Sequence, residues 1–304
     1  MTINGKCRLV FVLLLLSLLL ILPLCKKEKQ ANVIQSLNPE PATLEFYKEH
    51  SVITNPGRYT YLYNTLPETV PQLSQVVQGL LLHEFHTNRY GVNLSEQRKK
   101  EARLREVENI IQRAMELSEK PLIQPRNPEN RVISNCRDYA VLMCSFLRDK
   151  GISARVRVGY AIYFEELHQY HWICEYWNQE KSEWVQVDAQ LDDVQKRYYE
   201  IDFDPFNVPS GKFLYAGEEF EIVNKDSDDF YSVKRSLIQD LAALNKIEAE
   251  LWDTASFMDI DEHQNSEMSN LLHRIVEITT SPYDRLPELR TIYENHSELR
   301  ILTN

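Results

Sequence analysis

The sequence predicts an α+β fold in which a helix that begins with a cysteine packs on an antiparallel sheet, between helical N- and C-terminal regions. Residues 136–150 carry apolar side chains at helical spacing, and Gly151 follows them as a typical C-terminal cap. Three segments with the composition of strands come next, at residues 154–164, 171–177 and 183–188. Amphipathic helical patterns precede and follow this block, and their apolar faces need the core as a partner.

Residues 1–25 have the pattern of a targeting segment. Lys6 and Arg8 precede an apolar run over residues 9–24, which is shorter than the ~20 residues that span a bilayer and suits a signal peptide. The run ends at Cys25 in a sequence, LPLC, that loosely resembles a bacterial lipoprotein cleavage site. An uncleaved signal anchor and a short buried helix are the alternatives. We therefore expect a membrane-associated protein, either an extracytoplasmic lipoprotein or a signal-anchored one.

A polar linker at residues 26–41 leads into a helical N-terminal region at residues 42–128. Within that region we expect one helix at residues 70–84. We expect a second helix that Ser95 caps and that continues to Leu117, because apolar residues recur there at helical spacing.

The central block occupies residues 129–226, and a proline-rich stretch marks the passage into it. Residues 227–304 read as a helical C-terminal region. The helices that we expect in this region lie at residues 232–252, 269–280 and 286–294.

A thiol, an imidazole and a carboxylate follow one another in the central block, as Cys136, His171 and Asp188. Cys136 lies at the helix start, where unpaired N–H groups and the helix dipole favour a thiolate. His171 opens the second strand-like segment, and Asp188 ends the third. This set suits a thiol nucleophile, a base that later acts as an acid, and a carboxylate that orients the imidazole.

Four elements in this order resemble the transglutaminase-like superfamily. They are Cys136 at a helix start, LRDKGISARV at residues 147–156, His171-Trp172, and WVQVD at residues 184–188. The sequences VDAQLD, FDPFNVPSGKFL and DLAALNK extend the resemblance toward a bacterial branch of that superfamily. The resemblance implies a papain-like core with a Cys-His-Asp triad, whose members here are Cys136, His171 and Asp188.

Other residues compete for two of these roles. His168 lies three residues before His171, but it belongs to a polar segment that precedes the apolar strand. Asp192 and Asp193 follow Asp188 and suit a turn or a helix cap. We therefore favour His171 as the base and Asp188 as the orienting carboxylate.

The remaining cysteines of the core have a structural interpretation. Cys144 is about 12 Å beyond Cys136 along the helix at 1.5 Å per residue, which is too far for a disulfide. Cys174 lies on the strand face opposite His171, because side chains alternate along a strand. We expect both to be buried as small hydrophobic residues.

No metal or cofactor is expected. His83 and His86, in the sequence HEFH, can share a helix face and bind a metal, but the zincin spacing is not met and no third ligand is evident. A position in the core or in the wall of a cleft is favoured for them. Asp202 and Asp204 have turn composition without metal-ligand spacing.

The expected reaction is thiol-dependent acyl transfer or hydrolysis on a protein or peptide amide, through a thioester on Cys136. The N–H of Cys136 and a second donor that the sequence does not identify would hold the oxyanion. Resolution by an amine acceptor makes the protein a transglutaminase, and resolution by water makes it a cysteine protease or amidase. A non-catalytic interaction module on the same fold is the remaining alternative.

Two features bear on the partners. The third strand continues as Asp188-Ala189-Gln190-Leu191, where cross-linking members of the superfamily usually have Asp-Pro-Thr, so the acceptor side of the site is expected to differ. The net charge of -11 argues against nucleic-acid binding, because no basic face is present to displace phosphate counterions.

The apolar N-terminal segment generates a prediction about fractionation. We expect the full-length chain, expressed in bacteria, to sediment with membranes, and a chain that begins at Ala31 to stay in the soluble fraction. Mass spectrometry then separates the two membrane interpretations, because a diacylated N-terminal Cys25 supports a lipoprotein and an intact Met1 supports an anchor. Recovery of the full-length chain in the soluble fraction would contradict both.

Overall fold

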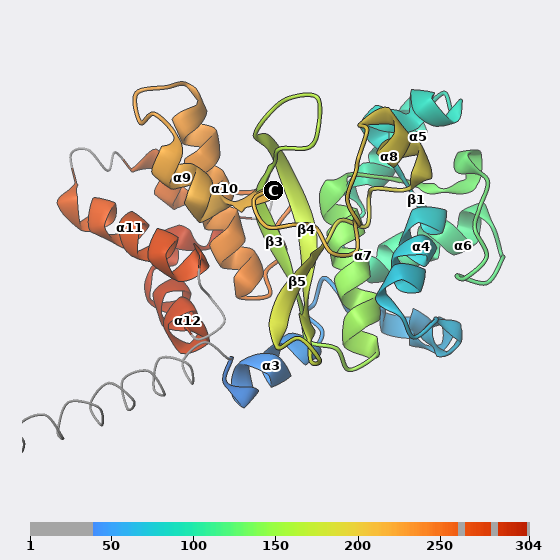
Figure 1. The fold of residues 1–304 in the computed structure, drawn as a ribbon, viewed down its shortest axis with the longest axis horizontal. Coiled ribbons are helices and arrows are strands. Elements are labelled where there is room, and N and C mark those ends of the chain that lie inside the picture. Colours follow the sequence, from blue (N-terminus) through green and yellow to red (C-terminus); the bar gives the residue numbers. More distant parts are fainter. Residues whose placement is uncertain (1–38, 261–264, 281–284, 303–304) are drawn as a thin grey trace, which may run out of the picture.

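The structure is a computed structural model that describes residues 39–260, 265–280 and 285–302 (Figure 1). Its centre is a four-stranded antiparallel sheet with the strand order β5-β4-β3-β6. The strands are β3 (Ala154–Ala161), β4 (Gln169–Asn178), β5 (Glu183–Val187) and β6 (Phe213–Tyr215). Helix α7 (Cys136–Asp149) packs against β4, and helix α10 (Asp229–Leu244) packs against β3 on the other side of the sheet. The predicted α+β fold, with a Cys-bearing helix on an antiparallel sheet and helical flanks, is confirmed.

Beyond its first helix, the N-terminal region packs on the side of the sheet that α7 covers, whereas Tyr47 of that first helix belongs to the cluster of the C-terminal helices. Its elements are α3 (Pro41–Lys48), η1 (Gly57–Thr65), α4 (Val70–Leu80), β1 (Leu81–His83), η2 (Glu84–Tyr90), α5 (Glu96–Lys99), η3 (Lys100–Arg103), α6 (Val107–Leu117), η4 (Pro128–Asn130) and β2 (Val132–Ser134). Leu73 of α4, Ile111 of α6, Leu142 of α7 and Val156 of β3 belong to one buried cluster. Helices α4 and α6 therefore share a hydrophobic core with α7 and the sheet.

The C-terminal region packs on the opposite face of the sheet. Its elements are α9 (Ala216–Ile222), α10, β7 (Thr254–Ala255), η5 (Ser256–Asp259), α11 (Ser266–Thr280), α12 (Leu286–Asn295), η7 (Ser297–Leu299) and β8 (Ile301–Leu302). Helix α8 (Asp193–Tyr198), in the segment that leads to them, lies instead beside the N-terminal region, where Arg89 donates to Gln195 at 2.5 Å (Figure 1). A second buried cluster joins Tyr160 of β3 to Leu237 of α10, Ile275 of α11 and Leu289 of α12. The sheet is thus the middle of three layers (Figure 1).

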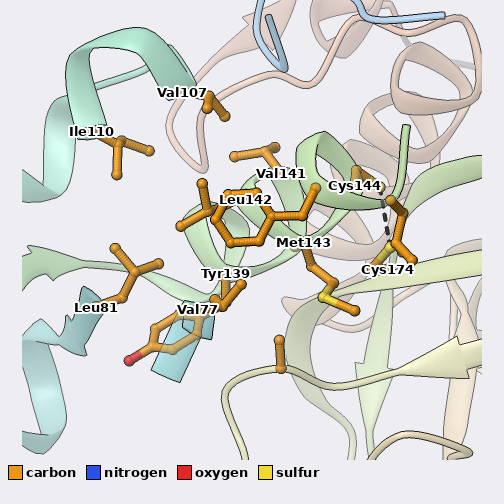
Figure 2. Packing of buried hydrophobic residues seen from close by; sticks show 14 of the residues in the cluster. Val77, Leu81, Val107, Ile110, Tyr139, Val141, Leu142, Met143, Cys144 and Cys174 are labelled. Carbon is orange, nitrogen blue, oxygen red and sulfur yellow. Dashed lines mark hydrogen bonds between the residues drawn. The ribbon is translucent and has the colours of Figure 1, made fainter. Parts of the chain in front are cut away.

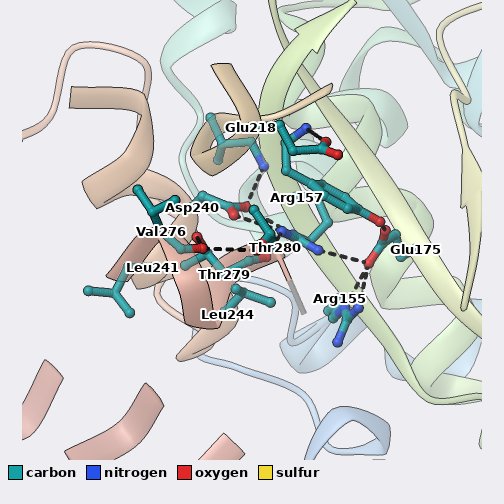
Figure 3. Close-up of polar contacts among 12 residues, drawn as sticks. Arg155, Arg157, Glu175, Glu218, Asp240, Leu241, Leu244, Val276, Thr279 and Thr280 are labelled. Atoms are coloured by element: carbon teal, nitrogen blue, oxygen red, sulfur yellow. Dashed lines mark hydrogen bonds and ion pairs between the residues drawn. The ribbon is translucent and has the colours of Figure 1, made fainter. Parts of the chain in front are cut away.

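The sequence ARVRV in β3 reflects this layered arrangement. Val156 and Val158 belong to the core shared with α7, while Arg155 and Arg157 alternate with them. Arg157 donates from Nε and Nη2 to the two carboxylate oxygens of Asp240, at 3.0 and 2.8 Å, and also to the Thr279 carbonyl (Figure 3). A fully buried ion pair therefore connects the central strand to α10 and α11.

The predicted bounds of two helices in the N-terminal region were wrong. The helix expected at residues 70–84 ends at Leu80, because residues 81–83 pair as strand β1 in parallel with β2. Ser95 does cap a helix, but only the short α5. The chain starts again as α6, whose first N–H, that of Val107, donates to the Ile53 carbonyl at 2.8 Å.

The C-terminal helices were closer to expectation. The helix expected at residues 232–252 ends at Leu244, where Lys246 takes a left-handed conformation with φ of 62°. It does not continue, since the carbonyls of Glu248 and Ala249 accept hydrogen bonds from Arg137 instead. Helices α11 and α12 match their expected positions within a few residues, and Gly151 ends α7 with φ of 70°, as predicted.

Strand β6 was not predicted. It pairs with β3 at Gly159, where a Cβ would clash with the Leu214 carbonyl oxygen, so a glycine is needed for the close approach. The expected leader at residues 1–25 and most of the linker lie outside the described residues. Within the described ranges, no helix is both long enough and apolar enough to cross a membrane.

The buried Arg157–Asp240 pair generates a stability prediction. Changing Asp240 to Asn should lower the free energy of unfolding by about 3–5 kcal/mol, because it removes the charge that balances a buried guanidinium. Glu294→Gln is the matched control, since Glu294 pairs with Arg290 on the surface with 61% of its side chain exposed, and this change should cost less than about 1 kcal/mol. Urea unfolding of both variants measures the difference, and equal small losses would contradict the assignment.

Candidate active site

Cys136 is the first residue of α7, and the segment before it fixes its position. Strand β2 runs parallel to β1, with Ser134 opposite His83, and leads directly into Asn135. The Asn135 side chain accepts from the Asp138 N–H at 3.3 Å, and the Asp138 carboxylate accepts from the Asn135 N–H at 3.0 Å. This capping box leaves Cys136 at a helix N-terminus, where the N–H groups have no acceptor in the helix and attract an anion.

Arg137 anchors the same helical turn to the C-terminal region. Its buried guanidinium donates to the carbonyls of Glu248 and Ala249, at 2.7 Å each, and to the Arg105 carbonyl at 2.9 Å. It also pairs with the Asp138 carboxylate at 3.1 Å. Burial raises the pKa of Asp138 to about 7 even though Arg137 opposes this shift. The start of α7 is therefore bonded through Arg137 to the N-terminal region, at Arg105, and to the C-terminal region, at Glu248 and Ala249.

His171 and Asp188 come from adjacent strands. His171 lies on β4, and Asp188 is the first residue after β5. The His171 Nε2 atom lies 2.8 Å from Oδ2 of Asp188, which also accepts from the Tyr163 hydroxyl at 2.7 Å. The other oxygen of Asp188 accepts from the Gln190 N–H at 3.0 Å. Asp188 is thus fixed by three donors and orients the imidazole.

The Cys136 thiol lies near enough to the same imidazole to raise its pKa and completes the set. Nδ1 is the ring atom left for the thiol, because Nε2 is occupied by Asp188. Burial disfavours the imidazolium, but the charge of Asp188, its hydrogen bond and the contact with Cys136 outweigh burial and raise the pKa of His171 to about 10. His171 is therefore protonated at neutral pH and can pair with a thiolate and supply a proton to a leaving group.

The three residues predicted from their order in the chain are thus brought together in the structure. Cys136 and His171 open into a cleft of about 400 Å³. The N-terminal region contributes His83, His86 and Arg89 to its lining, and the core contributes aromatic and acidic groups that include Phe164, Tyr170, Tyr199 and Glu166. A substrate would approach the thiol through this cleft.

The competing residues lie elsewhere. His168 pairs with Glu219 at 2.6 Å and is not a partner of Asp188. Asp192 caps α8 by accepting from the Val194 and Gln195 N–H groups, each at 3.0 Å, and Asp193 is the first residue of that helix. Asp202 and Asp204 are exposed, and Asp204 accepts from the Phe206 N–H in a turn.

Cys144 and Cys174 are buried, as expected for small hydrophobic residues. Neither has accessible surface, and their sulfur atoms face one another at 3.2 Å across the contact between α7 and β4 (Figure 2). Both belong to the hydrophobic cluster that supports the helix of Cys136. They lie in the core rather than in the cleft.

His83 and His86 line the cleft rather than one face of a long helix. His83 ends strand β1 and His86 lies in η2, and their rings stack with centroids 4.5 Å apart. Among the described residues, no group of three or more histidine, cysteine or acidic side chains is placed to hold a metal ion.

Three residues of the site were not singled out from the sequence. Tyr163 supports Asp188, Arg137 anchors the helix start, and Gln190 donates to Asp188 through its backbone. Arg137 could have been identified from the sequence, because it is a charged residue directly after the cysteine, at the start of a largely apolar helix. Tyr163 and Gln190 carried no comparable signal, because their contacts depend on loop conformation.

The raised pKa of His171 generates a pH prediction. A group whose pKa is higher in the folded than in the unfolded state stabilises the fold. This stabilisation is fully present when the pH is below the unfolded-state pKa, and it is lost as the pH rises through the folded-state pKa. The stability gap between the wild type and His171→Gln should therefore be largest below about pH 6.5 and shrink toward pH 10. Urea unfolding at pH 6, 8 and 10 tests this, and a gap that stays constant or widens would contradict it.

Comparison with known proteins relates the central part of the chain to one protein family. Residues 89–189 match the family model of the Transglutaminase-like superfamily. A search of curated proteins gave no match. Among solved structures, the chain is similar to "a Putative Cysteine Protease from Cytophaga hutchinsonii", at 15% identity and a TM-score of 0.32, over 51% of this chain and 46% of that chain. The chain therefore spans about half the length of that protein. The resemblance stated from the sequence is confirmed over residues 89–189, the part of the chain that this family model matches.

Proposed function

We propose that this protein is a cysteine acyltransferase or hydrolase that acts on an amide through a thioester on Cys136. The observation that carries the proposal is the 2.8 Å contact between His171 and Asp188 beside a thiol at a helix start, in an open cleft. A buried ion-paired imidazole next to a cysteine is the arrangement that nucleophilic thiol catalysis requires. The superfamily match of the same segment agrees with this chemistry.

The reaction proceeds in two steps. The Cys136 thiolate attacks the amide carbonyl carbon, and the tetrahedral oxyanion accepts a hydrogen bond from the Cys136 N–H. Collapse breaks the C–N bond, and His171 gives its proton to the departing amine, which leaves an acyl thioester. An incoming amine or water then loses a proton to His171 as it attacks the thioester, and the thiolate departs. Asp188 keeps the imidazole oriented throughout both steps.

The substrate class is part of the proposal. A glutamine side chain or a peptide bond of a protein suits a cleft of about 400 Å³ that opens to solvent. The leader would hold the protein at a membrane, so accessible substrates would be proteins or peptides at that surface. Amine acceptors yield cross-linking or modification, and water yields a protease or amidase.

Incubation of the full-length chain with a glutamine-containing protein and a fluorescent primary amine tests the proposal, with ammonia release followed in parallel. Amine incorporation identifies a transferase, and ammonia or new chain termini without incorporation identify a hydrolase. Silence over a broad peptide panel would overturn the enzyme assignment in favour of an interaction module.

Triad variants sharpen this assay. Cys136→Ser, His171→Ala and Asp188→Ala should each lower kcat by about 10⁴- to 10⁶-fold, and a double change should cost little more than one, because the residues act as a unit. His168→Ala is the matched control, since His168 is also a histidine paired with a carboxylate but lies outside the triad. A loss of turnover in His168→Ala with retention in His171→Ala would reverse the assignment of the base.

A further inference from the structure

The end of strand β1 lies beside the start of the cysteine helix. Parallel pairing places His83 opposite Ser134, two residues before Cys136, so the carboxyl ends of β1 and β2 meet at the cleft. His83 and Cys136 both line that cleft. An oxyanion that forms at Cys136 therefore has the imidazole of His83 as a neighbour in the same cleft.

The tautomer of His83 is fixed by the backbone. Its Nδ1 accepts from the Phe85 N–H at 3.3 Å, so the ring proton of the neutral imidazole must lie on Nε2. Nε2 has no hydrogen-bond partner within the part of the chain that the structure describes. His83 is only 7% exposed, and that exposure leaves its Nε2 in contact with the cleft that it lines. A substrate oxygen that enters the cleft can accept this N–H in place of water.

The environment of His83 keeps it neutral. Burial lowers its pKa well below the usual value, and the neighbouring His86, His171 and Arg89 lower it further. A neutral imidazole donates without taking part in the proton transfers of His171. It also adds no cation that would compete with His171 for the thiolate.

We propose that the Nε2–H of His83 is the second donor of the oxyanion hole, and that it acts with the Cys136 N–H on the carbonyl oxygen of the acyl substrate. This inference rests on the acyl transfer proposed above. No covalent bond forms or breaks at His83, which holds its proton throughout and only strengthens its hydrogen bond as negative charge develops on the oxygen.

Three other polar groups of the cleft fit this role less well. The Tyr170 hydroxyl already donates to Gln239 at 2.5 Å. Gln190 lines the same cleft, but the atom of its amide that is buried without a partner is the acceptor Oε1. His86 also has a buried unpartnered ring nitrogen, Nδ1, but the Tyr199 hydroxyl can be donor or acceptor to its Nε2, so no backbone bond fixes its tautomer. The Phe85 N–H does fix that of His83, whose free nitrogen is therefore a donor.

Two reactions of Cys136 in the full-length chain separate this role from a structural one. Alkylation by iodoacetamide proceeds without an oxyanion, whereas acetylation by p-nitrophenyl acetate passes through one. Peptide mass mapping follows each product at Cys136, with Cys136→Ser as the blank for other nucleophiles. The variants are His83→Phe, which keeps a ring without an N–H, His83→Gln, which restores a donor, and Gln190→Ala, which removes the competing amide.

His83→Phe should slow acetylation by about 10²-fold while alkylation stays close to the wild-type rate, and His83→Gln should recover part of the loss. Unchanged acetylation in His83→Phe would overturn the inference. So would a parallel loss of both reactions, which would make His83 a support of the Cys-His pair, or a larger loss of acetylation in Gln190→Ala. A wild-type chain that is alkylated but never acetylated would instead overturn the acyl transfer itself.

Discussion

Helix α7 begins in the protein interior, and the burial of that end is the constraint on which the site depends. The first N–H groups of a helix have no acceptor within it, and leaving them unpaired away from water is unfavourable. Asn135 satisfies the N–H of Asp138, and Arg137 is surrounded by the carbonyls of residues 105, 248 and 249. The N–H of Cys136 keeps no acceptor within the helix, and Cys136 lines the cleft, so this donor is available to a substrate oxygen in the proposed reaction.

Buried charges decide how the layers are oriented. Arg137 and Arg148 of α7 pair with Glu250 and Glu248, while Arg157 of β3 pairs with Asp240, so each ion pair joins the core to the C-terminal region. Although burial opposes it, the charges of Arg155 and Arg157 lower the pKa of Glu175 to about 2. Replacing such pairs by apolar residues is often neutral for stability, whereas breaking one is costly. We infer that their main effect is to specify one packing of the helices on the sheet.

Patterns that are local in sequence were predictable, and contacts between distant segments were not. The helix of Cys136 and strand β3 follow from apolar spacing and from the alternation of ARVRV, and the order of Cys136, His171 and Asp188 identified groups that the fold brings together. Strands β1 and β6 are only three residues each, and pairing with distant strands defines them. The same non-local pairing ended the helix expected at residues 70–84, because the edge of β2 outweighed local helix propensity.

The limits of the superfamily match show why the core does not determine the substrate. The match covers residues 89–189, which include the triad and Arg89. His83, Phe85 and His86 lie before that segment, and Tyr199 and Leu251 lie after it, yet all five line the cleft. These sides of the cleft are therefore supplied by the flanking regions, in the way that a shared fold supports different functions through its additions. If the proposed reaction takes place at Cys136, a core that keeps the triad can keep that reaction while the flanking walls of the cleft select the substrate.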